Sequence, residues 1–150
     1  FRSGTLPLPL CVGLGKASEL AQTEMADEQA RLLALREKLY QGICARVPEA
    51  ALNGDQEQRI PGNLNLSFAG IDGEALLAGL KEIAVSSGSA CTSASVEPSY
   101  VLKALGLDDA LARSSLRIGL GRFTTEAEVG IAINEISKQV EALRQATAAE

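Results

Sequence analysis

The sequence contains no histidine and no tryptophan, and only 3% of its residues are aromatic. The lack of histidine removes the commonest general base and the commonest metal ligand, so we expect no metal site. Any proton transfer must use another side chain or a group outside these 150 residues. Because aromatic side chains are scarce, we expect a core of leucine, isoleucine, valine and alanine.

Long apolar runs are also missing. None approaches the roughly 20 residues that span a bilayer, so we expect no membrane segment. The first four residues include neither an initiator methionine nor the basic-then-apolar pattern of a signal peptide, which suggests a cut or processed chain. The formal charge of −5 argues against nucleic acid as a partner, because phosphate binding rewards dense lysine and arginine.

Three cysteines, Cys11, Cys44 and Cys91, lie far apart in the sequence. An odd number without CxxC spacing fits neither a disulfide framework nor a zinc site. We therefore expect a reducing, cytoplasmic location. Cys11 and Cys44 fall within apolar helical stretches, so they are interpreted as small structural residues.

The hydrophobic pattern predicts an α+β fold, a small sheet covered by helices. Residues 6–24 and 25–47 predict two helices, or one long bent helix. The alternation of polar and apolar residues in 63–68 predicts a strand. The other expected elements are helices at 72–80 and 98–106, a turn of helix at 108–112, strands at 83–85 and 116–120, and a final helix after the capping box 125–128.

Cys91 differs from the other two cysteines because residues 86–95 around it are all small. This composition predicts a loop with no large apolar neighbour to bury the thiol. An exposed thiol on such a loop suits a nucleophile, although a serine-rich loop is often only a connection. No lysine or arginine adjoins Cys91, so activation of the thiol must come from elsewhere in the fold or from a cofactor.

Seven segments of the sequence together resemble the cysteine desulfurases of the class-V aminotransferase superfamily. The resemblance is closest to the housekeeping type that serves iron–sulfur cluster assembly, the IscS/Nfs or NifS-like group. It covers almost the whole chain and keeps the family's order. The matching segments are Arg2 to Pro7, Leu52 to Asp55, Ser86 to Ser93, Glu97 to Leu102, Ala104 to Gly106, Ser115 to Arg117, and Leu120 to Glu126.

The resemblance implies the small C-terminal domain of a fold-type I transferase that uses pyridoxal phosphate. Such a domain has a small, mainly antiparallel sheet covered by helices, with a long leading helix. Residues 1–24 would link to the pyridoxal-binding domain, and residues 25–150 would carry a mobile cysteine loop at 86–97. The family's pyridoxal-binding lysine, ring-stacking histidine and ring-nitrogen aspartate correspond to positions before Phe1. We therefore expect residues 1–150 alone to bind no cofactor and to be inactive.

The resemblance also implies an activity and the residues that carry it. In this family a homodimer converts L-cysteine to L-alanine with pyridoxal phosphate. The sulfur passes through an enzyme persulfide to an iron–sulfur scaffold protein and other acceptors. By position, Cys91 matches the persulfide cysteine, Arg117 the arginine that holds the substrate carboxylate, and Thr5 a threonine that contacts the cofactor phosphate across the dimer interface. Arg122 is interpreted as structural, tying the last strand to its surroundings.

Other interpretations remain at this stage. Arg117 could extend its charge into solvent from a strand end, and Thr5 could cap the helix at Pro7. The chain could be a persulfide carrier that needs no pyridoxal phosphate, or an interaction domain without chemistry. A selenocysteine substrate is a further alternative. Arg117 and Thr5 together favour the desulfurase, because a carrier would have no use for both.

Overall fold

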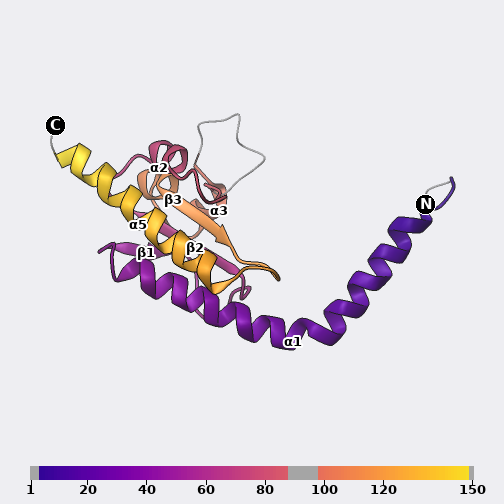
Figure 1. Cartoon of the computed structure of the whole chain (residues 1–150). Coiled ribbons are helices and arrows are strands. Elements are labelled where there is room, and N and C mark those ends of the chain that lie inside the picture. The colour runs from indigo at the N-terminus through magenta and orange to yellow at the C-terminus, as the bar shows by residue number, and fades with distance from the viewer. Residues whose placement is uncertain (1–3, 88–97, 149–150) are drawn as a thin grey trace.

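A three-stranded antiparallel sheet carries the polar residues that matter for function (Figure 1). The computed structural model describes residues 4–87 and 98–148. The α+β architecture confirms the expected fold class. In chain order, the elements are α1 (Leu8–Cys44), β1 (Ala50–Leu52), β2 (Asn63–Phe68), α2 (Gly73–Gly79), α3 (Tyr100–Ala104), α4 (Asp109–Arg113), β3 (Ser115–Gly119) and α5 (Glu126–Ala148).

The two faces of the sheet differ sharply in polarity. The strand order is β1-β2-β3, with Leu64 opposite Ile118 and Leu66 opposite Leu116. These four side chains are buried on the core face, which α5 and the second half of α1 cover (Figure 1). Because strand side chains alternate, the opposite face is polar. We call it the polar face; it consists of Asn63, Asn65, Ser67, Ser115 and Arg117.

The core is built mainly from leucine, isoleucine and valine, as the composition predicts, with Phe68 fully buried among them. Each fully buried side chain of this size contributes roughly 1.5–3 kcal/mol relative to an exposed one. The apolar stripe of α1 enters this core only from Leu32 onward, through Leu35, Leu39 and Ile43. The second half of α1 is therefore anchored by packing on the sheet and α5.

One long helix, α1 (Leu8–Cys44), takes the place of the two predicted helices and bends along its length (Figure 1). Two hydroxyl groups donate back to carbonyls within it. Ser18 donates to Leu14 O at 2.9 Å, and Thr23 donates to Glu19 O at 3.1 Å and to Leu20 O at 3.2 Å. Side-chain bonds of this kind compete with the backbone ladder and bend helices.

Side-chain hydrogen bonds cap the starts of three helices. Asp72 accepts a hydrogen bond from Ala75 N at the start of α2, and Asp108 accepts one from Leu111 N at the start of α4. At α5, Thr125 N donates to Glu128 Oε2 at 2.7 Å, and Glu128 N donates to Thr125 Oγ1 at 3.3 Å. The capping box read from residues 125–128 is therefore confirmed. These backbone and side-chain bonds hold the pKa of Glu128 below its ordinary value.

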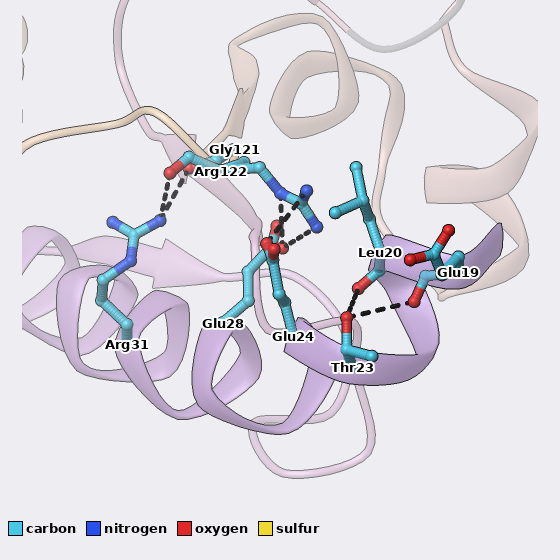
Figure 2. A network of polar contacts seen from close by, with 8 residues as sticks. All are labelled: Glu19, Leu20, Thr23, Glu24, Glu28, Arg31, Gly121 and Arg122. Carbon is cyan, nitrogen blue, oxygen red and sulfur yellow. Dashed lines mark hydrogen bonds and ion pairs between the residues drawn. The ribbon is translucent and has the colours of Figure 1, made fainter. Parts of the chain in front are cut away.

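Two arginines join α1 to the loop after β3, and Figure 2 shows their contacts. The Arg122 guanidinium donates twice to Glu28 Oε2, at 2.9 and 2.6 Å, and pairs with Glu24 at 3.2 Å. Arg31 donates in turn to the carbonyls of Arg122 and Thr124, at 2.5 and 2.8 Å. The hydrogen bond to Glu28 raises the pKa of Arg122. The structure thus supports the expected tethering role of Arg122.

Three sequence expectations are corrected. Residues 83–85 do not form a strand: the segment meets β3 only at Ser86, and a cavity of about 480 Å³ lies between residues 83–85 and the end of β3. The short strand β1 went unpredicted because three residues show too little alternation to be seen. Cys11 is exposed rather than buried, because the first half of α1 has no packing partner within the described chain.

A buried amide network fixes the three strands on the polar face. The Asn53 side chain, 7% exposed, donates to Asn65 Oδ1 and to Ser67 Oγ, both at 2.7 Å. Ser67 donates back to Asn53 Oδ1 at 2.9 Å, and its hydroxyl lies 2.8 Å from that of Ser115. One amide therefore links the turn after β1 to both β2 and β3.

Replacing this amide should destabilise the protein. We expect Asn53→Ala to lower the free energy of unfolding by about 2 kcal/mol, because the buried Ser67 hydroxyl and Asn65 carbonyl lose their partner. Urea unfolding of the purified protein measures this change. Asn63→Ala, on an exposed position of the same face, is the matched control and should stay within about 0.5 kcal/mol of the parent. Equal effects of the two variants would contradict a structural role for the Asn53 network.

Candidate functional site

Arg117 stands in the middle of β3 on the polar face of the sheet. The residues on either side of it, Leu116 and Ile118, are buried, so the pleat directs the Arg117 side chain away from the core, where it is exposed. Across the sheet its partner is Asn65. A guanidinium displayed on a rigid strand beside an amide is well placed to bind a carboxylate.

The backbone of Arg117 is held by Ser86, which lies beyond the outer edge of β3. Arg117 N donates to Ser86 O at 2.6 Å, and Ser86 N donates to Arg117 O at 3.2 Å. The Arg117 Nη2 atom lies 3.5 Å from Ser86 Oγ. The segment that leads toward Cys91 is therefore joined directly to the arginine.

A polar groove of about 420 Å³ opens over this face, and Arg117 forms part of its wall. Asn63 and Asn65 contribute amides from β2, and Ser99 contributes a hydroxyl from the segment that precedes α3. The far wall is the apolar side of α3. The groove is large enough for a small polar molecule with a carboxylate at Arg117.

A second arginine of the groove, Arg59, is committed to its own loop. Its guanidinium donates to Asp55 O at 2.5 Å and to Asn53 O at 2.7 Å, and burial lowers its pKa. Asp55 accepts hydrogen bonds from the backbone N–H groups of Gln58 and Glu57, which hold the pKa of its carboxyl below the ordinary value. These residues shape the rim, whereas Arg117 faces the groove from the sheet.

Cys91 lies outside the described residues, so its proposed exposure stays a prediction. Its distance from the bridge is nevertheless limited by the chain. Cys91 lies five positions after Ser86, and five extended residues span about 17 Å at most. The second cysteine of interest, Cys44, is half-buried, and burial raises the pKa of its thiol. That shift disfavours Cys44 as a nucleophile at neutral pH.

Thr5 does not lie near Arg117 within this chain. It is exposed and lies ahead of α1, whose N-terminal end projects away from the sheet (Figure 1). The residue that caps α1 is Pro7, without a side-chain bond, so the alternative in which Thr5 is the helix cap is wrong. Within the described part of the chain, the Thr5 hydroxyl takes part in no side-chain cap at this helix start.

Comparison with known families assigns the chain to a family. The family model "Aminotransferase class-V" matches residues 1–131. The chain belongs to the class-V aminotransferase family. It is 56% identical over 145 residues to the cysteine desulfurase IscS of Anaeromyxobacter sp. (strain Fw109-5), covering 97% of the chain and 36% of that relative. It is 55% identical over 145 residues to the cysteine desulfurase of Rattus norvegicus, covering 97% of the chain and 32% of that protein.

Solved structures agree with this assignment. A NifS-like protein superposes with a TM-score of 0.80 at 30% identity, over 95% of this chain and 36% of that one. DndA from Streptomyces lividans superposes with a TM-score of 0.57 at 35% identity, over 79% of this chain and 33% of that one. The chain therefore spans about a third of the length of the relatives that it matches.

The sequence did not reveal that two residues, Ser86 and Asn65, lie beside Arg117. Ser86 belongs to the serine-rich segment that carries the family resemblance, but no sequence pattern says which serine meets Arg117. Asn65 shows the period-2 alternation of a strand, yet its position beside Arg117 depends on the register between β2 and β3. Among the described residues, no group of three cysteine or carboxylate side chains could hold a metal ion, and no helix is long and apolar enough to cross a membrane.

Proposed function

We propose that the protein containing this chain is a cysteine desulfurase that converts L-cysteine to L-alanine and retains the sulfur on Cys91. One observation carries the proposal: Arg117 faces a polar groove and is bonded to Ser86, five residues before Cys91. The short stretch of chain between Ser86 and Cys91 would allow the proposed thiol to reach the groove at Arg117. The relatives named as cysteine desulfurases support the same activity.

Arg117 binds the substrate and sets its orientation. The guanidinium fork donates charge-assisted hydrogen bonds to the two carboxylate oxygens of cysteine. Asn65, beside it on β2, lies where it can donate a further hydrogen bond from its amide. Holding the carboxylate at the sheet directs the rest of the amino acid, and its sulfur, into the groove.

Cys91 accepts the sulfur. As a thiolate it attacks the substrate sulfur, forming a sulfur–sulfur bond while the substrate carbon–sulfur bond breaks. The released electron pair stays with the substrate carbon, which takes up a proton and leaves as alanine. An arginine guanidinium is not deprotonated in proteins, so Arg117 does not supply this proton and another group does.

Pyridoxal phosphate, when bound, would supply the electron sink that makes the substrate carbon–sulfur bond labile. In this chain, Thr5 fits a phosphate contact, because its exposed position precedes the first turn of α1 and Gly4 beside it adopts a φ of 131°. The positive N-terminal end of the dipole of a long helix also favours an anion. We assign Thr5 to the phosphate of a second subunit's cofactor, as the family resemblance implies.

The division of the chain follows from the same proposal. Residues 1–24 would join this domain to the domain that binds the cofactor, and residues 25–150 form the small domain. The exposed apolar side chains Leu6, Leu8, Leu10 and Leu14 support a buried setting for the first half of α1 in the complete homodimer. Sulfur acceptors, including an iron–sulfur scaffold protein, would take the persulfide in a reducing, cytoplasmic compartment.

A direct assay tests the proposed activity. The complete protein, loaded with pyridoxal phosphate, should release alanine and, with a thiol reductant, sulfide from L-cysteine. Mass spectrometry should find one added sulfur atom on the peptide that contains Cys91. A persulfide carrier would take up sulfur without releasing alanine, and an interaction domain would do neither. Either of those results would refute the desulfurase.

A further inference from the structure

Ser86 supplies both backbone hydrogen bonds of Arg117. In an antiparallel pair, the N–H and C=O of one residue point to the same neighbouring strand. Because both groups of Arg117 bond to Ser86, at 2.6 and 3.2 Å, they point away from β2. Arg117 and Asn65 are therefore a non-hydrogen-bonded pair, in which the side chains stand close together but the backbone is not bonded.

The bridge is isolated on this side of β3. Residues 83–85 separate from the strand, with a cavity between them and its end. Ser86 is also half-buried, whereas Arg117 is exposed. Within the part of the chain that the structure describes, the outer edge of β3 thus forms a bridge at Arg117, the residue that carries the guanidinium.

The side chains of Ser86 and Arg117 also lie close together. Residues of a hydrogen-bonded antiparallel pair project from the same face, which brings Ser86 Oγ to 3.5 Å from Arg117 Nη2. At that distance the hydroxyl is a weak hydrogen-bond partner for the guanidinium. Ser86 therefore restrains the arginine from the side opposite Asn65.

We propose that Ser86 is a positioning residue for substrate binding: its backbone bridge holds Arg117 in the orientation that receives the carboxylate. This inference rests on the proposed desulfurase function. It adds that the affinity for the carboxylate depends on a residue that does not touch the substrate. Ser86 acts through Arg117, so its contribution must vanish when the guanidinium is absent.

A double-mutant cycle on the complete, cofactor-loaded protein tests this dependence with L-alanine as the ligand, since alanine has the carboxylate but no sulfur for Cys91 to attack. Ser86→Pro removes the N–H that donates to Arg117 O, and we expect alanine to bind about tenfold more weakly. In an Arg117→Ala background the same substitution should change the alanine affinity by less than about twofold. Ser86→Thr keeps the N–H and hydroxyl and favours extended backbone, so it should bind alanine as the parent does.

Ser87→Pro is the matched control, because Ser87 is exposed and proline there restricts Ser86 to the extended backbone that it already has. It should bind alanine normally. Equal losses in Ser86→Pro and Ser87→Pro, or an equal Ser86→Pro loss with and without Arg117, would overturn the positioning role while leaving desulfurase activity of the parent intact. If Ser86→Pro does not fold, an amide-to-ester replacement at Ser86, which removes only the N–H that donates to Arg117 O, takes its place in the cycle, and an unchanged alanine affinity then overturns the proposal. A parent protein without desulfurase activity would refute the proposed function itself.

Discussion

The Cys91→Ser variant of the complete protein should keep its pyridoxal phosphate and still bind L-cysteine, but persulfide formation should fall by roughly 1000-fold or more. The hydroxyl of serine is far less nucleophilic than a thiolate and cannot form the sulfur–sulfur bond. The groove around Arg117 is unchanged by this substitution, so binding should persist. Cofactor absorbance on addition of cysteine measures binding, and alanine release measures turnover.

Cys11→Ser and Cys44→Ser are the matched controls for this experiment. Cys11 is exposed on α1 and Cys44 is half-buried near its end, with its thiol bonded to Ala50 O at 3.9 Å. Both variants should release alanine at the parent rate. If Cys91→Ser also released alanine and sulfide at that rate, Cys91 would not be the sulfur acceptor.

Arg117→Ala should weaken the binding of L-cysteine, raising KM by about 100-fold. The reason is the loss of two charge-assisted hydrogen bonds to the substrate carboxylate. Arg59, which also lines the groove, cannot readily replace it, because the Arg59 guanidinium is held by the carbonyls of Asn53 and Asp55. Steady-state kinetics of alanine release measures the change.

The ligand itself provides the control for Arg117. Cysteamine has the amine and thiol of cysteine but no carboxylate, so its affinity as a competitive inhibitor should be nearly the same in the parent and in Arg117→Ala. Arg117→Lys keeps the charge but loses the two-pronged geometry, and it should give an intermediate KM. An unchanged KM and rate in Arg117→Ala would return this residue to the interpretation of a solvent-facing strand arginine.

Much of the fold was predictable because the relevant forces are local. The helical periodicity of residues 25–47 reappears in α1, and the alternation of Asn63 to Phe68 reappears in β2. The caps at Asp72, Asp108 and Thr125 were predictable for the same reason, since a capping bond joins residues three positions apart. The strand predicted at residues 83–85 is wrong because a strand is stabilised by its partner, and this segment bonds to β3 only at the following residue, Ser86.

For the candidate site too, local features were predictable and long-range contacts were not. The sequence by itself determined the residue types: a lone thiol among small residues, an arginine in a strand, and the order of segments that marks a class-V aminotransferase. Only the tertiary structure decided which groups meet. Register placed Asn65 against Arg117, and a bridge between residues 31 positions apart placed Ser86 on its other side. Such contacts depend on strand pairing across the chain, and their energies are absent from any local pattern.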